Sequence, residues 1–282
     1  MSAAGDYLKA IRTMGPNAKR FLLFTILSSI SWSINNLDLN LYLHSLGYRQ
    51  DFIGLLNGLP SFVVMLLGLP IGFLADRRGY LPFLTIGTAL SSLTALGTAL
   101  SAAKLPLLLF ALVNGVAGST AWVIGAPLLM SITKPGERVF LFSLQSALMM
   151  GTGFIGSLLG GVIPKAVATY SGGTSMDVIP LRAALLVMFL FDLLALLPLL
   201  GVKLGPRGDG GAPAANRPAN RANPLPKNAA ELRLFLKLLA PEAMVALGAG
   251  AMVTFFQLFF NLKFRLSPEQ ISPIFAFSSV AT

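Results

Sequence analysis

Five long runs of the chain contain no charged residue, and their length constrains the fold more than any other feature. Each is 20 to 29 residues long, and they cover residues 52–75, 79–103, 105–133, 139–164 and 243–262. About 20 residues of α-helix cross the ~30 Å hydrocarbon core of a bilayer. Only 11% of the 282 residues are charged, whereas a soluble domain has about 25%. The chain is therefore expected to cross a membrane several times, and a single soluble globule is excluded.

Two further apolar runs each enclose one acid and complete a set of seven expected spans. They are residues 21–43, which contain Asp38, and residues 183–202, which contain Asp192. The 28 glycines and 18 prolines favour helices packed through small residues, because the strands of a β-barrel would alternate polar and apolar side chains. The predicted fold class is an all-α membrane protein.

Cysteine is absent, and histidine occurs once, at His44. The chain therefore cannot form a disulfide, a cysteine-based metal site or an imidazole cluster, and we expect no metal and no cofactor. It also lacks a nucleotide-binding loop of the G-x-x-x-x-G-K type and any constellation typical of a nucleophilic enzyme. We expect neither an enzyme nor an ATP-driven pump.

The distribution of Lys and Arg predicts the orientation of the chain. If the N-terminus is cytoplasmic, 15 of the 21 basic residues fall in cytoplasmic segments and 6 in outer segments. Basic residues stay preferentially on the cytoplasmic side in short loops, so we expect a cytoplasmic N-terminus. The brevity and composition of the chain are typical of a bacterial protein, and we expect it in the plasma (inner) membrane. Because the same bias explains the net charge of +10, a nucleic-acid partner is not expected.

Composition divides the chain into four segments. They are a cytoplasmic N-terminal segment (residues 1–20), a bundle of six transmembrane helices (21–202), a flexible cytoplasmic linker (203–239), and the start of a second bundle (240–282). Within the first segment, residues 5–14 are either a short helix on the membrane surface or a frayed tail.

The linker differs sharply in composition from the apolar spans before and after it. Residues 208–228 consist mostly of Gly, Ala, Pro, Asn and Arg, a composition that buries too little apolar surface to fold. After them, residues 232–239 carry Arg233 and Lys237 four positions apart among leucines. This spacing predicts a basic amphipathic helix that leads into the seventh span.

A polar pattern in the first span returns in the seventh. The triplets are Ser33, Asn36 and Asn40, then Thr254, Gln257 and Asn261, with a constant offset of 221 residues. This predicts two parallel repeats of six helices. The last run, residues 270–282, gives about 20 Å of helix, too short to cross a bilayer. We therefore expect a fragment of a twelve-helix protein, and a native seven-helix protein is the alternative.

The loop after the second span resembles the cytoplasmic signature of the major facilitator superfamily, G-x-x-x-D-R-x-G-R-R. Four of its six fixed positions match, at Gly72, Asp76, Arg77 and Gly79, and Arg78 supplies part of the charge missing from Tyr80 and Leu81. The resemblance implies a six-helix bundle, a seventh helix and a partial eighth. It also implies that this loop is a gate rather than a substrate site.

Two weaker matches concern coupling and export. Asn114, Gly115 and Gly118 are similar to a family element linked to proton coupling, but Ala111 stands where its basic residue belongs. In the fifth span, four glycines are similar to the family's antiporter element: Gly153, Gly156, Gly160 and Gly161. Helix packing through small residues explains these glycines equally well.

Polar side chains inside the spans predict the substrate cavity, because such groups are expected to face a bundle interior or water. In the first span they form two adjacent helical stripes. The predicted cavity residues are Asn35, Asn36, Asp38, Asn40, Tyr42, Asn57, Asn114, Gln145, Gln257 and Asn261. The resemblance implies the same, since helices one, two, four and five line the cavity in this family.

Asp38 and Asp192 are the candidate proton-coupling residues, because each places an acid inside a span. For Asp38 the alternative is a structural acid bonded to neighbouring amides, and for Asp192 an interhelical hydrogen bond is the stronger hypothesis.

Trp32 and Trp122 also lie inside spans. For each of them packing is the stronger hypothesis, and contact with a ligand is the alternative.

The function expected from these features is secondary active transport of small solutes by alternating access, with proton-coupled efflux of drugs or metabolites as one form. A strongly anionic substrate is disfavoured because the cavity stripes carry no basic residue. The expected partners are a small-molecule substrate, protons and the lipid bilayer, with a monomer when complete. A seven-helix receptor, an assembly partner or an inactive fragment are the alternatives.

Overall fold

The computed structural model describes residues 14–133, 135–203 and 228–281. All regular structure in these residues is helical. The elements are α2 (Pro16–Ser45), α3 (Gln50–Arg78), α4 (Tyr80–Leu100), α5 (Lys104–Ser131), η1 (Pro135–Glu137), α6 (Arg138–Ser171), α7 (Val178–Gly201), α8 (Ala229–Met252), η3 (Val253–Phe255), α9 (Phe256–Phe264) and α10 (Pro268–Ala281). This confirms the predicted all-α class. Residues 5–13 of the proposed surface helix and residues 204–227 of the linker lie outside the described residues.

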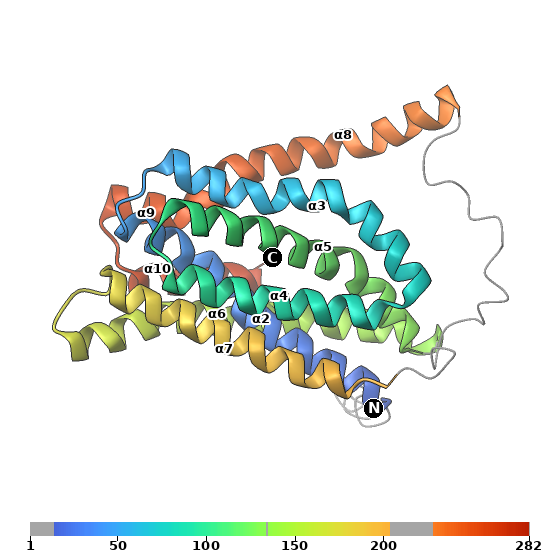
Figure 1. Ribbon diagram of the computed structural model, residues 1–282, viewed down its shortest axis with the longest axis horizontal. Helices are drawn as coiled ribbons and strands as arrows, with labels where there is room; N and C mark the ends of the chain where they lie inside the picture. The colour runs from blue at the N-terminus through green and yellow to red at the C-terminus, as the bar shows by residue number, and fades with distance from the viewer. Residues whose placement is uncertain (1–13, 134, 204–227, 282) are drawn as a thin grey trace.

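Helix α2 lies beside α6 and α7 in the bundle (Figure 1). It packs against both of these helices. Helix α4 packs against α5 on one side and α7 on another, and α3 packs against α5. Half of the thirty residues of α2 are buried, Asp38, Ile34 and Leu41 among them. Within its polar stripes, Asp38 and Asn40 are therefore buried against protein, whereas Asn36 is exposed.

Glycines set the closest helix–helix contacts. A Cβ atom at Gly156 of α6 would lie 2.7 Å from the Ile30 carbonyl oxygen of α2, and one at Gly115 of α5 would lie 2.9 Å from the Pro60 Cα of α3. Helices within membranes pack through such small residues because water does not drive them together there. These two glycines let α2 approach α6 and α3 approach α5.

Within the described residues, six helices are long and apolar enough to cross a membrane. Five are α3 to α7, and the sixth combines α8, η3 and α9 over Ala229–Phe264. The expected first span, residues 21–43, forms part of α2, but α2 is not among the six. Its many Ser and Asn side chains lower its hydropathy.

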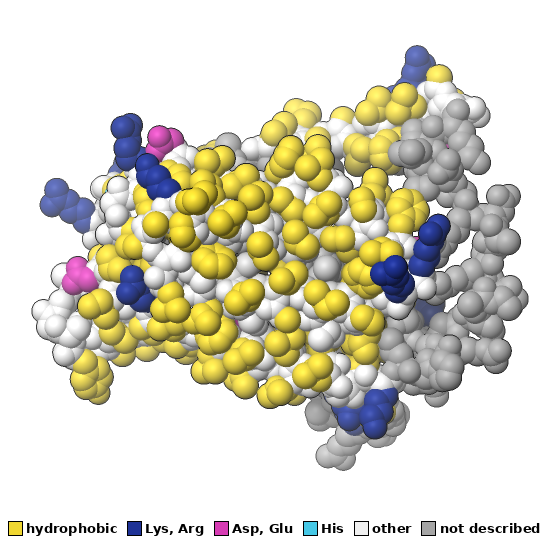
Figure 2. Space-filling model, viewed as in Figure 1, with side chains coloured by type: hydrophobic (Ala, Val, Ile, Leu, Met, Phe, Trp, Pro, Cys, Tyr) yellow, Lys and Arg dark blue, Asp and Glu magenta, His cyan; other side chains and the backbone are white. Residues whose placement is uncertain are grey.

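Charged side chains gather at the two ends of the molecule, and apolar side chains cover its middle (Figure 2). The basic segment at residues 232–239 is the beginning of α8 and continues into the seventh span without a break.

Gly79 is the single residue between α3 and α4. Its φ of 97° suits glycine, and its N–H donates to the Ala75 carbonyl oxygen at 2.8 Å.

Candidate functional site

Asn40 joins three elements at one end of the bundle. Its Nδ2 donates to the Thr254 carbonyl oxygen in η3 at 2.6 Å, and its Oδ1 accepts from Asn57 Nδ2 of α3 at 2.8 Å. The Asn40 side chain is buried. This junction ties the first two helices to the seventh span through hydrogen bonds, beside the apolar packing of Phe255 and Leu258 against the same helices.

A second junction lies at the same end, between the α6–α7 loop and α10 (Figure 1). Ser175 Oγ donates to Glu269 Oε2 at 2.7 Å, and Asn261 Nδ2 contacts the Met176 sulfur at 3.5 Å. Asn261 also donates to the Leu266 carbonyl oxygen at 2.9 Å. We call these contacts, together with those of Asn40, the hydrogen-bonded end of the bundle.

Opposing effects act on the Glu269 carboxylate. Partial burial raises its pKa, but hydrogen bonds from its own backbone N–H, Ser175 and Ser267 and the charge of Lys165 lower it more. The net result is a pKa below the ordinary value of 4.5. The folded state therefore favours the ionised form of Glu269.

This shift predicts a loss of stability in acid. A carboxylate with a lowered pKa stabilises the fold above its unfolded pKa and loses that contribution as the pH falls through its folded pKa. Thermal unfolding of the purified protein between pH 6 and pH 3 measures it. Glu269→Gln retains an acceptor for Ser175, so its melting temperature is expected to fall less steeply below about pH 4.5. Equal slopes for the two proteins would contradict the assignment.

Asp38 is completely buried where α2 meets α6. A Cβ atom at Gly160 would lie 2.8 Å from its Oδ2, and neither carboxylate oxygen has a hydrogen-bond partner in the described part of the chain. The amides predicted as its neighbours, Asn36 and Asn40, bond instead to Trp32 and Thr254. Asp38 is enclosed between helices and does not lie on an open surface.

Asp192 lies between α7 and α4. Ser91 Oγ donates to its Oδ2 at 3.0 Å, and nearby Ser31 of α2 donates to the Met188 carbonyl oxygen at 3.3 Å. The side chain is 9% exposed. This is the geometry of an interhelical hydrogen bond.

The remaining predicted cavity residues separate into different environments. Asn36 is exposed, whereas Asn35 and Gln145 are half-buried. Asn114 Oδ1 accepts a long hydrogen bond of 3.4 Å from Thr94 of α4. Gln257 is buried, and its Oε1 has no partner among the described residues.

The side chain of Tyr42 is packed between helices. Its side chain is fully buried, and its hydroxyl donates toward the Ala99 and Ser101 carbonyl oxygens, at 3.0 and 3.2 Å. The hydroxyl thereby satisfies carbonyl groups at the C-terminal end of α4. The helical stripe that grouped Tyr42 with Asp38 did not show that α4 packs over this position.

The signature loop forms the turn between α3 and α4. A Cβ atom at Gly72 would lie 3.1 Å from Val123 of α5, so this glycine permits close packing. Arg77 and Arg78 are exposed. Tyr80 Oη donates to Asp76 Oδ1 at 2.5 Å.

Sequence reasoning treated Tyr80 only as a departure from the family pattern. The structure shows that its phenol contacts the signature acid directly, across the turn made by Gly79. The spacing of four residues between Asp76 and Tyr80 was the available signal.

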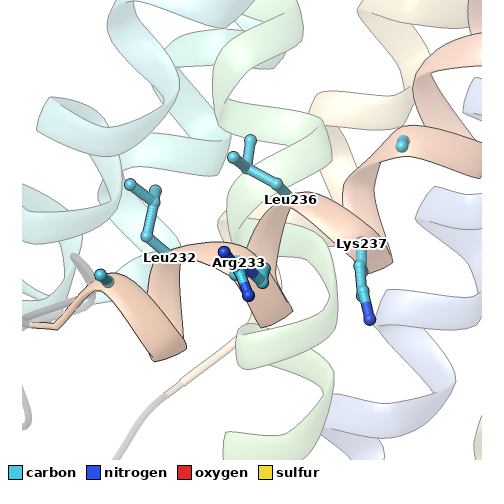
Figure 3. A pocket seen from close by; sticks show the side chains of 6 residues that line it. Leu232, Arg233, Leu236 and Lys237 are labelled. Carbon is cyan, nitrogen blue, oxygen red and sulfur yellow. The ribbon is translucent and has the colours of Figure 1, made fainter.

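A hollow of about 430 Å³ lies beside the exposed start of α8. Figure 3 shows Leu232 and Leu236 pointing to one side of this helix and Lys237 to the other. Its lining residues are Ala229, Leu232, Arg233, Leu236, Lys237 and Ala240. None of them belongs to the polar stripes, so the hollow is not part of the predicted cavity.

Comparisons with known proteins agree with this architecture. No curated protein matches the sequence. Two solved structures match it with a TM-score of 0.70, and both are of a bacterial homolog to the human lysosomal transporter Spinster in an inward-facing conformation. The unoccupied one is 17% identical and the occupied one 18%, and each match covers 93% of this chain. The chain spans 59% and 57% of those two chains.

The sequence profile described as Major Facilitator Superfamily matches residues 21–282, from the beginning of the first expected span to the last residue. The matched region includes the signature loop, both polar triplets and all of the hydrogen-bonded end. The chain belongs to the major facilitator superfamily.

Proposed function

We propose that this protein is a secondary active transporter of small solutes that works by alternating access in the plasma (inner) membrane, with its N-terminus in the cytoplasm. The observation that carries the proposal is the uneven contact between the six-helix bundle and the elements after the linker. Hydrogen bonds join them at one end, at Asn40 and Ser175. At the other end the described side chains of α8 are exposed.

The hydrogen-bonded end is the outer end in this proposal. The excess of basic residues at the opposite side supports that orientation. The inward-facing state of the two similar solved structures supports it as well. These hydrogen bonds, each worth about 1 kcal/mol net, act together with the packing of α10 on α6 and of Leu258 against the bundle, and in this proposal transport breaks and remakes that contact in every cycle.

Asp38 is the proposed site of proton coupling. An acid in a membrane span is costly, about 2.5 to 3.5 kcal/mol on insertion scales, and no hydrogen bond within the described residues compensates Asp38. Because α2 also carries Asn40, a change of charge at Asp38 acts on the same helix that holds the outer junction. Proton-driven efflux of drugs or metabolites is the form of transport that we propose.

A reversible cross-link between Ser175 and Glu269 tests the proposed outer gate. With both residues replaced by cysteine and joined by a short bis-methanethiosulfonate reagent, transport is expected to fall by at least tenfold, because the outer end cannot open. A reductant should restore it. The readout is solute accumulation across a pH gradient in proteoliposomes, using a substrate found by a transport screen of the complete gene product.

The matched control joins Thr174→Cys to Asp177→Cys with the same reagent. These residues contact each other within one loop, where Thr174 N–H donates to Asp177 Oδ2 at 2.8 Å. Their cross-link should leave transport unchanged. Full transport by the cross-linked Ser175–Glu269 pair would refute the gate.

A further inference from the structure

The chain has two tryptophans, and the fold brings them together. Trp32 of α2 and Trp122 of α5 form an edge-to-face pair, with ring centroids 6.5 Å apart and an interplanar angle of 79°. Both residues are at least nine positions from either end of their helices. Tryptophan usually anchors at membrane interfaces, so a pair in the middle of two spans is unusual.

Both rings are accessible despite their contact. Among the described residues, Trp32 is 55% exposed and Trp122 is 72% exposed, although half of α2 is buried. An edge-to-face pair covers one ring face and leaves others open. The pair therefore presents aromatic surface to a neighbouring molecule instead of filling a core.

The position of Trp32 along α2 relates the tryptophan pair to the proposed transport cavity. Trp32, Asn36 and Asn40 follow one another at intervals of four residues along α2. Asn40 holds the outer junction with Thr254, and Trp32 lies about 12 Å before it along the helix. The tryptophan pair thus lies on the inner side of the hydrogen-bonded end, where an inward-open cavity would be.

The surrounding chemistry favours a cation. A tryptophan ring face attracts cations more strongly than any other side-chain ring. Asn36, one turn from Trp32, is exposed and uses its Nδ2 on the Trp32 carbonyl oxygen at 3.0 Å, which leaves Oδ1 as an acceptor. The sequence has no Lys or Arg between Arg20 and Arg49 or between Lys104 and Lys134.

We propose that Trp32 and Trp122 form a binding subsite for organic cations that carry an aromatic ring. This inference rests on the proposed transport function and names the substrate class of the same cavity. The ring of the ligand stacks on the open indole surface, its cationic group faces the indole π system, and Asn36 Oδ1 accepts from any N–H that it carries.

Tryptophan fluorescence tests the subsite without transport. The complete gene product is placed in nanodiscs, with any tryptophan outside residues 1–282 replaced by phenylalanine, and titrated with benzyltrimethylammonium. A saturable change in emission is expected. Benzylsulfonate, which has the same ring and the opposite charge, and tetramethylammonium, which lacks the ring, are each expected to bind at least tenfold more weakly.

Single variants locate the ligand, because each keeps one tryptophan as reporter. Trp32→Ala and Trp122→Ala should each weaken binding of benzyltrimethylammonium about tenfold. Leu193→Ala, at an exposed apolar position of α7, should leave it unchanged. Equilibrium dialysis with radiolabelled probe gives the same constants independently of fluorescence, and unchanged thermal unfolding shows that the variants are folded.

Three results would overturn the subsite: unchanged affinity in both tryptophan variants, equal binding of benzylsulfonate, or no response to any probe. The outcome is separate from that of the transport proposal. Binding that depends on the pair in a protein without transport would overturn the transport function alone. Transport that is insensitive to both tryptophan variants would overturn the subsite alone.

Discussion

Gly115→Ala and Gly156→Ala are each expected to destabilise the protein by about 1 to 3 kcal/mol, the usual cost of overpacking. The new methyl group at residue 156 would lie 2.7 Å from both the Ile30 carbonyl oxygen and the Ser33 Cβ. At residue 115 it would lie 2.6 Å from the Val63 Cβ and 2.9 Å from the Pro60 backbone. Backbone atoms cannot turn aside as a flexible side chain can, so the helices must separate.

Each variant has a control in its own helix. Gly125 of α5 and Gly151 of α6 have no described atom within 4 Å of a Cβ at their positions. Alanine there is expected to be neutral or stabilising by up to about 1 kcal/mol, because it favours helix more than glycine does. Thermal unfolding in one detergent compares the four variants. Equal melting temperatures for the close and open positions would contradict the packing described for α2–α6 and α3–α5.

The second large effect is expected from Asp38→Asn. Asparagine keeps the shape of the side chain but cannot release a proton, so accumulation driven by a pH gradient should fall at least tenfold. Exchange of substrate without a gradient should persist, because the substitution leaves the helix contacts in place. The measurement compares gradient-driven accumulation with exchange in proteoliposomes at several pH values.

Asp192→Asn is the comparison for Asp38→Asn. Asparagine keeps an oxygen that accepts from Ser91, so thermal stability and the pH dependence of transport should both stay as in the unsubstituted protein. Unchanged transport and pH dependence in Asp38→Asn would exclude coupling through Asp38. A loss of pH dependence only in Asp192→Asn would transfer that role to α7.

The sequence predicted helices better than it predicted their neighbours. All seven expected spans fall within or across described helices, because long apolar runs leave few alternatives. Residues 21–43 show the limit of hydropathy: this run was found as a span only by allowing Asp38 inside it, and its Ser and Asn side chains keep α2 out of the six helices that are apolar enough by composition. What a helix touches depends on rotation and tilt, which its own sequence does not determine.

The candidate site illustrates the same limit. Periodicity put Tyr42 and Asp38 on one stripe of α2, yet Tyr42 bonds to α4 while Asp38 faces Gly160 of α6. The contact of Asn40 with Thr254 joins residues 214 positions apart, and no local pattern predicts it. The repeated triplets did mark both segments that meet there.

The central claim is that the cavity opens to one side of the membrane at a time. The chain has no cysteine, so Asn36→Cys gives a single reactive thiol within residues 1–282. A membrane-impermeant maleimide is applied to sealed vesicles of either orientation. Tyr170→Cys, at a residue that is 94% exposed near the proposed outer end of α6, reports the orientation of the vesicles.

Residue 36 is expected to be labelled from the cytoplasmic side at rest and to be protected from the outside. Imposing the driving pH gradient with substrate should expose it to the outside and reduce its labelling from the cytoplasm. Equal labelling from both sides in every condition, or labelling only from the outside at rest, would contradict alternating access with the hydrogen-bonded end as the closed outer gate.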